Sequence, residues 1–281
     1  MCEILTGGFA PIQWQFWPAN TIRVINWNID RGLRLSEITD FLASQRADLL
    51  TLQEVDLNTR RTHRRNIADE LARSLRMNYV FGCEFEELTQ GTRSSPAYHG
   101  QATLSRWRLR RPRIIRFQRQ SGFWRPRWFL PRTEPFQERL GGRIALVTEV
   151  EVASTIFAVY NLHLESRGND GLRLAQLKEV LDDAARTAPR GPALLAGDLN
   201  FDISEGPMAA LVQESGFRDV FPQRRLRIRP PHHLFGVART IDWALLSGPL
   251  EASGAQLHAS VNASDHYPIS FTVRPGSVAG H

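Results

Sequence analysis

The chain has 281 residues, 42% of them hydrophobic and 23% charged, which allows one large core or two small ones and excludes wholesale disorder. The net charge is +6, carried almost entirely by arginine because Lys178 is the single lysine. A basic surface attracts anions such as nucleic acid, anionic lipid or free phosphate esters, although a biased genome would produce the same use of arginine.

The first half of the chain alternates short β-branched apolar runs with amphipathic stretches. This strand–helix–strand rhythm indicates α/β layering. Ser36 is predicted to be the N-cap of the first helix, whose buried stripe contains Ile38, Phe41 and Leu42. The predicted elements are a strand at 21–27, the helix after Ser36, a strand at 47–53, a helix at 66–75 and a strand at 78–82.

The second half begins with residues 107–143, which are rich in arginine, tryptophan and proline and show no clear period. They are predicted to contain one strand at 112–117 and then a long loop. A tight turn at Ala153-Ser154 is predicted to join the next two strands. The further predicted elements are strands at 144–152 and 155–162, a helix at 172–185 ended by prolines at 189 and 192, a strand at 193–196, a helix at 208–213 and final strands within 239–246 and 261–273.

The sequence contains no internal repeat and no convincing linker. We therefore expect one domain at residues 21–274, with an N-terminal extension at 1–20 and a C-terminal tail at 275–281.

Polar residues stand next to apolar strands at six points along the chain. Strand edges of layered α/β folds are where sites are built, because the sheet holds the side chains while loops leave room for a ligand. Carboxylates and a carboxamide gathered in one place suit a hard cation such as Mg²⁺ or Mn²⁺, which would also offset their mutual repulsion. The six points are Asn28 with Asp30, Glu54, His163, Asp198 with Asn200, Asp242, and Asp265 with His266.

Each of these points has an ordinary structural explanation when it is taken alone. Asn28 and Asp30 before Gly32 are typical of an Asx turn, and a histidine between leucines, as His163 is, is more often a hydrogen-bonded core residue than a catalyst. Asp242 is harder to explain, because a carboxylate between apolar residues needs a partner. The functional interpretation therefore depends on all six occurring together, in order.

The ordered set resembles the endonuclease/exonuclease/phosphatase superfamily, which includes DNase I-like nucleases, abasic-site endonucleases, sphingomyelinases and inositol-polyphosphate phosphatases. The resemblance covers nearly the whole chain, from residue 22 to residue 272. It implies an α/β fold of the DNase I-like type: a four-layer α-β-β-α sandwich with two central mixed β-sheets and the site at one sheet edge. The matching segments are 26–30, 52–56, 100–106, 160–164, 197–200, 241–243 and 264–269.

The resemblance also implies a metal site. Glu54 corresponds to the principal metal carboxylate, with Asn28 beside it. Asp30 and Asp265 would lie near the metal, either as direct ligands or through water. The expected cofactor is Mg²⁺ or Mn²⁺.

The catalytic roles implied by the resemblance belong to five residues. Asp198 would orient or deprotonate the attacking water, and Asn200 would hold a phosphate oxygen. His266 would bind or polarise the scissile phosphate, with Asp242 as its charge partner. His163 would contact the phosphate or assist the leaving group.

Three further residues, Gln101, Arg106 and Arg143, are candidates for substrate binding. Gln101 stands where the family usually has asparagine, and it is one methylene longer. Arg106 opens a basic aromatic segment. Arg143 directly precedes a strand and either reaches the phosphate or caps the sheet.

Two segments, 106–111 and 123–129, combine arginine with aromatic residues. This mixture suits nucleic acid, because arginine pairs with phosphate and aromatic rings stack on bases. It also suits a contact with anionic lipid, where tryptophan prefers the headgroup zone. A small core under a long loop, with solvated arginines, explains it equally well. Arginines at 60–65 and 224–227 would extend a basic rim.

We therefore expect a divalent-metal-dependent phosphoesterase that hydrolyses a phosphodiester bond in nucleic acid. The alternative is a lipid or small-molecule phosphoesterase, either sphingomyelinase-like or inositol-phosphate phosphatase-like, with which residues 163–166 are compatible. Residues 230–235 replace the tryptophan-rich stretch that usually precedes the Ile-Asp segment in abasic-site endonucleases, which disfavours that activity. A catalytically inactive binding module is disfavoured because every main site residue type is present.

The expected location is the cytoplasm. The start of the chain lacks a basic segment followed by a long apolar stretch, so no signal peptide is predicted. No apolar run approaches the length of a membrane span. The two cysteines, Cys2 and Cys83, are too few for a disulfide framework or a zinc site. Nothing in the sequence indicates an oligomeric state.

Overall fold

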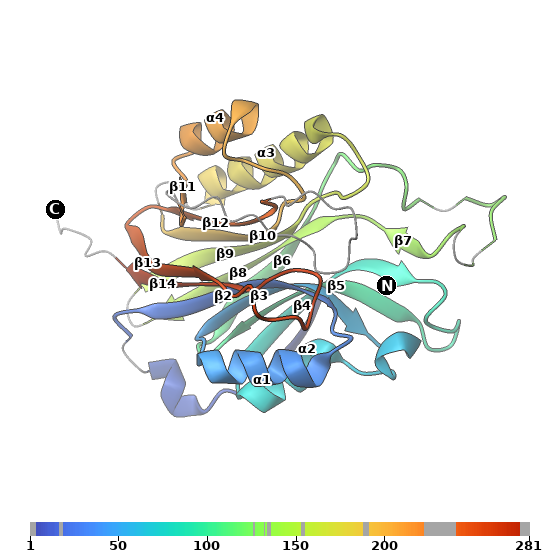
Figure 1. Cartoon of the computed structure of the whole chain (residues 1–281), viewed down its shortest axis with the longest axis horizontal. Coiled ribbons are helices and arrows are strands. Elements are labelled where there is room, and N and C mark those ends of the chain that lie inside the picture. Colours follow the sequence, from blue (N-terminus) through green and yellow to red (C-terminus); the bar gives the residue numbers. More distant parts are fainter. Residues whose placement is uncertain are drawn as a thin grey trace.

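Two β-sheets pack face to face, and helices cover the outer face of each sheet (Figure 1). The computed structural model describes residues 4–16, 19–125, 127–131, 133, 136–152, 155–187, 191–221 and 240–275. Across these residues the expected four-layer sandwich with two mixed sheets is confirmed, because apolar layers fill the space between the sheets and the space beneath the helices. The turn expected at Ala153-Ser154 lies outside the described residues.

The first sheet, sheet A, has the strand order β1-β4-β5-β3-β2-β14-β13, and β7 pairs with β4 beside this path. β2 and β3 run parallel and are joined through helix α1, while the other described pairs are antiparallel. The strands are β1 (Ile4–Gly8), β2 (Ile22–Arg31), β3 (Leu49–Leu57), β4 (Asn78–Glu87), β5 (Ala97–Ser105), β7 (Arg139–Gly141), β13 (Leu250–Leu257) and β14 (Ile269–Pro275).

The second sheet, sheet B, has the order β11-β12-β10-β9-β8-β6. It repeats the plan of sheet A: β9 and β10 run parallel and are joined through helix α3, and the other described pairs are antiparallel. The strands are β6 (Leu109–Arg116), β8 (Ile144–Val152), β9 (Thr155–His163), β10 (Ala193–Asp198), β11 (Arg218–Asp219) and β12 (Asp242–Ser247).

Several strands differ from the expected elements. β1 and β13 contain glycine, a poor strand former, and they are strands because they pair with β4 and β14 at the sheet edges. Because residues 4–8 belong to sheet A, the expected boundary of the N-terminal extension at residue 20 is corrected: part of that segment is built into the fold. The central strand β5 is also absent from the expected elements, since its polar residues interrupt the apolar pattern.

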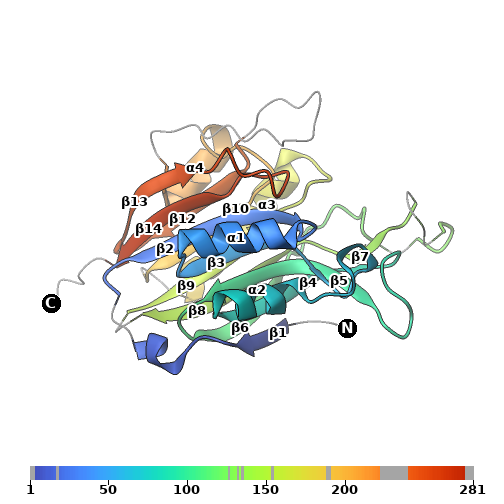
Figure 2. The same ribbon diagram turned by 60° about the horizontal axis from the view of Figure 1, so that its bottom comes forward.

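Helices α1 (Leu35–Gln45) and α2 (Ile67–Leu75) lie over the outer face of sheet A (Figure 2), and α3 (Asp170–Thr187) and α4 (Gly206–Glu214) cover sheet B. Short 3₁₀ turns stand at Ile12–Phe16 and Arg60–Thr62. The prediction of Ser36 as N-cap is wrong, because α1 begins at Leu35 and its N-cap, Arg34, makes an ion pair with Glu37 instead of a side-chain cap. No described helix is both long and apolar enough to cross a membrane.

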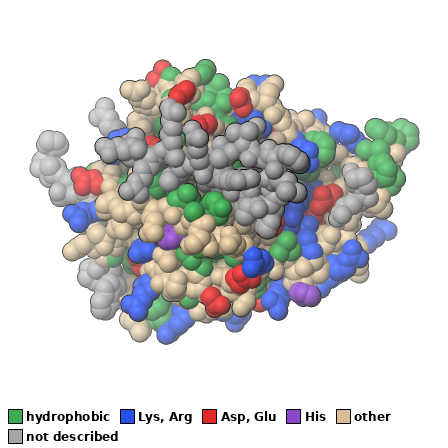
Figure 3. All heavy atoms as spheres, in the orientation of Figure 1, with side chains coloured by type: hydrophobic (Ala, Val, Ile, Leu, Met, Phe, Trp, Pro, Cys, Tyr) green, Lys and Arg blue, Asp and Glu red, His purple; other side chains and the backbone are tan. Residues whose placement is uncertain are grey.

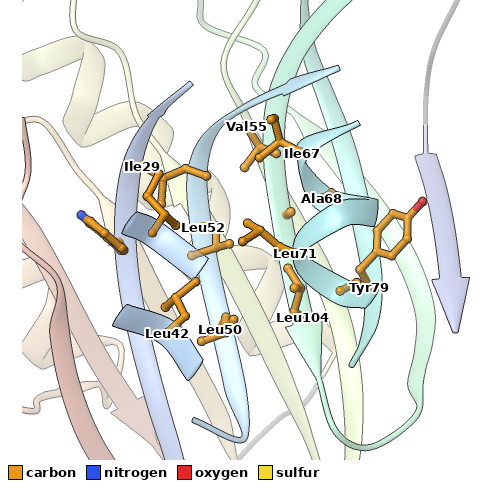
Figure 4. Packing of buried hydrophobic residues seen from close by; sticks show 14 of the residues in the cluster. Ile29, Leu42, Leu50, Leu52, Val55, Ile67, Ala68, Leu71, Tyr79 and Leu104 are labelled. Carbon is orange, nitrogen blue, oxygen red and sulfur yellow. The ribbon is translucent and has the colours of Figure 1, made fainter. Parts of the chain in front are cut away.

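Strand alternation divides the apolar side chains among three layers. On β2, Ile25 and Trp27 point to the layer under α1 and α2, part of which Figure 4 shows, whereas Ile22 and Val24 point to the layer between the sheets. Toward one end, the layer between the sheets becomes polar. There Gln53 of sheet A donates to Asn161 Oδ1 of sheet B at 2.7 Å, and both side chains are fully buried.

Candidate active site

The candidate site lies where this polar part of the layer between the sheets ends. Side chains two residues apart on a strand lie on the same face of the sheet. The residues that follow this polar region along each strand therefore meet at the same end of the sandwich. Asp198 pairs in register with His163 on β9 and with Asp242 on β12, which places the three side chains on one face of sheet B. From sheet A, Asn28 Nδ2 donates to Asp198 Oδ2 at 3.2 Å and links the two sheets.

Gly197 makes the close approach of β10 to β9 possible. A Cβ atom built on this glycine would lie 2.0 Å from the carbonyl oxygen of Leu162, and the backbone φ is 158°. We therefore expect Gly197→Ala to lower the free energy of unfolding by roughly 3 kcal/mol, the upper end of overpacking costs, measured by urea denaturation. Gly171→Ala is the matched control, because its added Cβ would meet only Asn169 Oδ1, at 3.4 Å. Equal stability of the two variants would contradict the prediction.

Glu54 enters the site through a β-bulge. Leu52 and Val55 both pack in the layer under α1 and α2, although strict alternation would place them on opposite faces of β3. The register of β3 shifts between these two residues, and Glu54 adopts a left-handed φ of 52°. The extra residue accommodates Glu54 without placing its carboxylate in the core layer, and Asn28 Nδ2 donates to Oε1 at 3.4 Å.

The neighbouring charges keep Glu54 ionised. Burial alone would raise its pKa, but the surrounding histidines and arginines, of which His99 has the largest effect, hold the pKa below its ordinary value. Asp30 behaves in the opposite way: burial, followed by the negative charge of Asp265, raises its pKa, and Glu54 adds to the effect. Ser264 Oγ donates to the carbonyl oxygen of Asn28 at 2.6 Å and ties the loop that carries Asp265 to β2.

Asp198 is the centre of the cluster. Its Oδ2 lies 3.6 Å from His163 Nε2 and 3.7 Å from His266 Nε2, and its Oδ1 accepts the backbone N–H of Asn200 at 2.9 Å. Burial, together with the negative charge of Asp242, raises the pKa of Asp198 to about 7. A carboxylate with a pKa near neutrality can gain and lose a proton under ordinary conditions.

His266 and Asp242 form a buried pair. His266 Nδ1 donates to Asp242 Oδ2 at 2.8 Å, and only 7% of His266 is exposed. Burial would lower the pKa of His266, but the charges of Asp242 and Asp198 raise it well above its ordinary value. Asp198, Asp242 and His266 have the spacing of a metal site, yet a protonated imidazole has no lone pair for a metal, so we interpret them as a proton-handling group.

His163 is held from behind by Arg143. The guanidinium NH1 donates to His163 Nδ1 at 2.8 Å and to Glu84 Oε2 at 3.0 Å, and NH2 donates to Ser166 Oγ at 3.1 Å. Because arginine can only donate, Nδ1 must accept, and the ring proton is on Nε2, the atom that faces Asp198. Burial and the charge of Arg143 lower the pKa of His163 well below its ordinary value, so the ring is neutral.

The expected substrate-binding residues are not placed as the sequence suggested. The guanidinium of Arg143 is occupied by His163, Glu84 and Ser166, so it is not free to cap the sheet or to bind a substrate. Gln101 is also behind the site: it is fully buried and donates to Glu84 Oε1 at 2.6 Å and to the carbonyl oxygen of Ile144 at 3.0 Å.

Arg106 is far from the other candidates. It follows β5 at the end where Ser105 pairs with Leu49, the first residue of β3, whereas Glu54 lies toward the other end of that strand. Its guanidinium pairs with Asp48 at 3.2 Å. The prediction that Arg106 belongs to the site is therefore corrected. Arg106 is part of a matching segment only because it directly follows strand β5.

Glu84, which joins Arg143 and Gln101, is not among the site residues expected from the sequence. A glutamate between Cys83 and Phe85 in a buried strand was the available signal, because a buried carboxylate needs a partner. Asn200 is placed beside Asp198, and its Nδ2 donates to the carbonyl oxygen of Leu164 at 3.1 Å.

A second buried cluster combines Asp56, Glu87 and His99 at metal-ligand spacing. Asp56 accepts from Arg61 Nε at 2.7 Å and from His99 Nδ1 at 2.8 Å, and Glu87 accepts from Arg61 NH2 at 3.0 Å. Arg139 Nε lies 2.8 Å from Glu87 Oε1. Since two guanidinium groups balance the two carboxylates, we interpret this cluster as a structural ion-pair network.

Comparison with known proteins agrees with the family resemblance that the motifs indicate. Residues 25–266 match the model of the Endonuclease/Exonuclease/phosphatase family. A search of curated proteins finds no match.

Solved structures share the fold over most of the chain. An endonuclease/exonuclease/phosphatase from Beutenbergia cavernae has a TM-score of 0.66 and 19% identity, covering 92% of this chain and 72% of that one. An endonuclease/exonuclease/phosphatase from Bacteroides vulgatus has a TM-score of 0.66 and 14% identity, covering 92% and 100%. TDP2 from Caenorhabditis elegans has a TM-score of 0.60 and 20% identity, covering 90% and 75%. At these identities the likeness concerns the fold alone.

Proposed function

The chain belongs to the Endonuclease/Exonuclease/phosphatase family, whose members hydrolyse phosphate esters, and from that premise we propose that it is a divalent-metal-dependent phosphodiesterase acting on nucleic acid. The observation that carries the proposal is the convergence on Asp198 of side chains from both sheets: Asn28 and His266 from β2 and the loop before β14 of sheet A, and His163 from sheet B. The net charge of +6 supports a polyanionic substrate.

Carboxylate and carboxamide oxygens are the donor types that a hard divalent cation prefers. Glu54 is ionised, because its pKa lies below the ordinary value. The pKa of Asp30 is raised by burial and by the negative charges of Asp265 and Glu54, and a bound cation would relieve the repulsion among these carboxylates. Glu54 and Asn28 would hold the ion, with Asp30 and Asp265 as direct or water-mediated ligands. A bound Mg²⁺ or Mn²⁺ would neutralise charge on the phosphoryl oxygens and make a bound water more acidic.

Four side chains of the protein have the remaining roles in the proposed reaction. Asp198, with a pKa raised to about 7, takes the proton of the attacking water. Protonated His266, held by Asp242, donates from Nε2 to a phosphoryl oxygen. Asn200 uses an amide N–H for another phosphoryl oxygen. Neutral His163 donates its Nε2 proton as a hydrogen bond, which supports contact with the phosphate over proton delivery to the leaving group.

One assay panel tests this function. Single-stranded DNA, RNA, duplex DNA, sphingomyelin, inositol phosphates and a chromogenic diester are incubated with the protein, with Mg²⁺ or with EDTA. We expect nucleic acid and the diester to be cleaved with Mg²⁺ only. Cleavage that persists in EDTA would contradict the metal, and turnover of the lipid or inositol phosphates without turnover of nucleic acid would contradict the substrate class.

The pH profile should shift when the charge of Asp242 is removed. Activity needs Asp198 deprotonated and His266 protonated, so it falls as the pH drops through the pKa of Asp198, about 7, and again at high pH as His266 loses its proton. Asp242→Asn removes a charge that raises both pKa values. Both limbs of the kcat/KM profile should therefore move to lower pH. Movement of either limb to higher pH would contradict these roles.

Arg143 should act on activity through His163. In Arg143→Met the imidazole loses its fixed proton position, and kcat should fall by roughly 10- to 100-fold, the usual cost of removing a residue that orients a functional group. Nitrogen NMR of the wild type should show His163 with its proton on Nε2. The double variant Arg143→Met/Glu84→Gln removes the buried charge that the single change leaves unpaired. Full activity in the double variant would contradict the positioning role.

A further inference from the structure

A pocket of about 280 Å³ lies beside the candidate active site and is lined by cationic and aromatic side chains. It is formed by the segment between β6 and β7 and by the loop that follows β9. This volume is near the lower limit of the roughly 300–1,000 Å³ typical of small-ligand sites. The lining residues are Phe123, Trp124, Arg127, Phe136, Gln137, Glu138, Arg139 and Arg167.

Trp124 connects the pocket to the catalytic residues. It is 7% exposed, and its indole N–H donates to the carboxylate of Glu165, two residues after His163, at 3.2 Å. On its other side the Trp124 ring packs on Phe85, with centroids 5.0 Å apart, and the guanidinium of Arg143 lies 5.3 Å from the Phe85 centroid. Arg143 also contacts His163, so the side chains that line the pocket pack directly against those that hold the candidate site.

The described residues leave part of the positive charge in the pocket without a carboxylate. Glu138 lies 3.6 Å from both Arg61 and Arg139, and these two arginines also pair with Asp56 and Glu87, so carboxylates fully offset their charge. Arg127 and Arg167 have no carboxylate partner among the described residues; their guanidinium carbons lie 6.0 and 5.1 Å from the centre of the Phe123 ring. Two unpaired guanidinium groups beside an aromatic ring suit a phosphate with an attached base.

The outer rim of the pocket exposes aromatic rings. Phe136 is 58% exposed and Phe123 47%, and beyond them the loop tip exposes 95% of Trp128. Figure 3 shows hydrophobic side chains at the right-hand end of the molecule, where the segment leading to β7 projects in Figure 1, with cationic side chains close by. Exposed rings of this kind are expected where a protein meets a ligand or a surface.

We propose that this pocket binds the nucleotide next to the scissile phosphodiester of a single-stranded polynucleotide, with Arg127 and Arg167 on its phosphate and Phe123 and Phe136 against the nucleoside. The proposal rests on the proposed function and names the part of the substrate that the protein grips outside the reacting centre. Stacking on aromatic rings tolerates any base, so the pocket selects for a second phosphate and not for sequence.

The test uses substrates that differ by one phosphate. A dinucleotide without terminal phosphates offers only the scissile group, and the same dinucleotide with an added 5′- or 3′-phosphate, or a trinucleotide, offers a second one. We expect wild-type kcat/KM to rise roughly tenfold with the second phosphate on one side, the effect of one charge-assisted contact. In Arg127→Gln/Arg167→Gln this preference should disappear.

Arg108→Gln is the matched control, because Arg108 is exposed, lines a different pocket and has no described ion pair. It should keep the preference for the second phosphate. A preference that survives in the double variant, or that Arg108→Gln abolishes equally, would overturn the proposal. Hydrolysis of a chromogenic diester by all variants separates this failure from failure of the proposed function, since a protein that cleaves no diester fails the latter.

A membrane surface is the competing partner for the exposed rings. Sedimentation with anionic phospholipid vesicles, measured for wild type and Trp128→Ser, decides between them. Vesicle binding that depends on Trp128, together with no effect of the second phosphate on cleavage, would assign the segment to a lipid surface and overturn the proposal. Absence of vesicle binding, with the expected phosphate preference, supports it.

Discussion

Replacing His266 with alanine is expected to reduce kcat for phosphodiester hydrolysis by about 10³-fold, within the range reported for loss of a positioned proton donor or an electrostatic contact to the transition state. The physical reason is the pair with Asp242, which stands at 2.8 Å and keeps His266 protonated inside the protein. The variant loses a positive charge that faces Asp198 and that we propose contacts the reacting phosphate. Steady-state kinetics with a chromogenic diester and Mg²⁺ measure the effect.

The alanine variant also leaves the buried Asp242 carboxylate without its imidazole partner, so stability must be measured beside activity. His266→Gln retains a side-chain N–H for Asp242 but cannot carry charge, and it should be nearly as inactive while melting closer to the wild type. His258→Gln is the matched control: His258 is partly buried and contacts Ser270 Oγ at 2.8 Å, away from the candidate active site. If His266→Gln turns over the substrate at the wild-type rate, the proposed role is wrong.

Replacing Glu54 is expected to have the second large effect. Glu54→Gln keeps the shape of the side chain and removes the negative charge that we propose holds the cation. We expect Mg²⁺-dependent kcat/KM to fall at least ~100-fold, and calorimetric titration with Mn²⁺ should show weaker binding. The calorimetric measurement is needed because a lost rate alone would not separate a metal ligand from a general base.

Glu251→Gln is the control for the loss of one negative charge outside the candidate site. Glu251 is exposed on β13 and pairs in register with Arg274, at the end of β14 opposite the site. It makes the same chemical change without touching the cluster. If Glu54→Gln binds Mn²⁺ with wild-type affinity, the proposed metal site is wrong. If Glu251→Gln loses as much activity and Mn²⁺ affinity as Glu54→Gln, the effect comes from net charge.

Most of the candidate site could be read from the chain because the relevant signals are local. Asn28, His163, Asp198 and Asp242 each stand beside an apolar strand, and the strand period places them on the face shared with the layer between the sheets. The same reasoning failed for Arg106, whose strand β5 runs antiparallel to β3 and carries it to the other end of sheet A.

Other features depend on contacts that no local pattern records. Arg143 contacts the buried side chains of Glu84 and His163 and the hydroxyl of Ser166, so its guanidinium holds His163 in place and is not free for a substrate. Glu54 reaches the site because β3 bulges at that residue. Trp124 appeared in the sequence as one of several aromatic residues in a basic loop, and only its hydrogen bond to Glu165 shows that the loop adjoins the candidate active site.

The sequence by itself determined the family, the succession of strands and helices in outline, and the residue types that end the strands, because hydrophobic periodicity and the polar residue that follows it are properties of neighbouring positions. The tertiary structure alone decided the strand register, the bulge at Glu54, the edge strand β1 and the partner of each buried charge. These depend on which strands meet across the whole sandwich, and a buried donor or acceptor takes the partner that packing brings within reach.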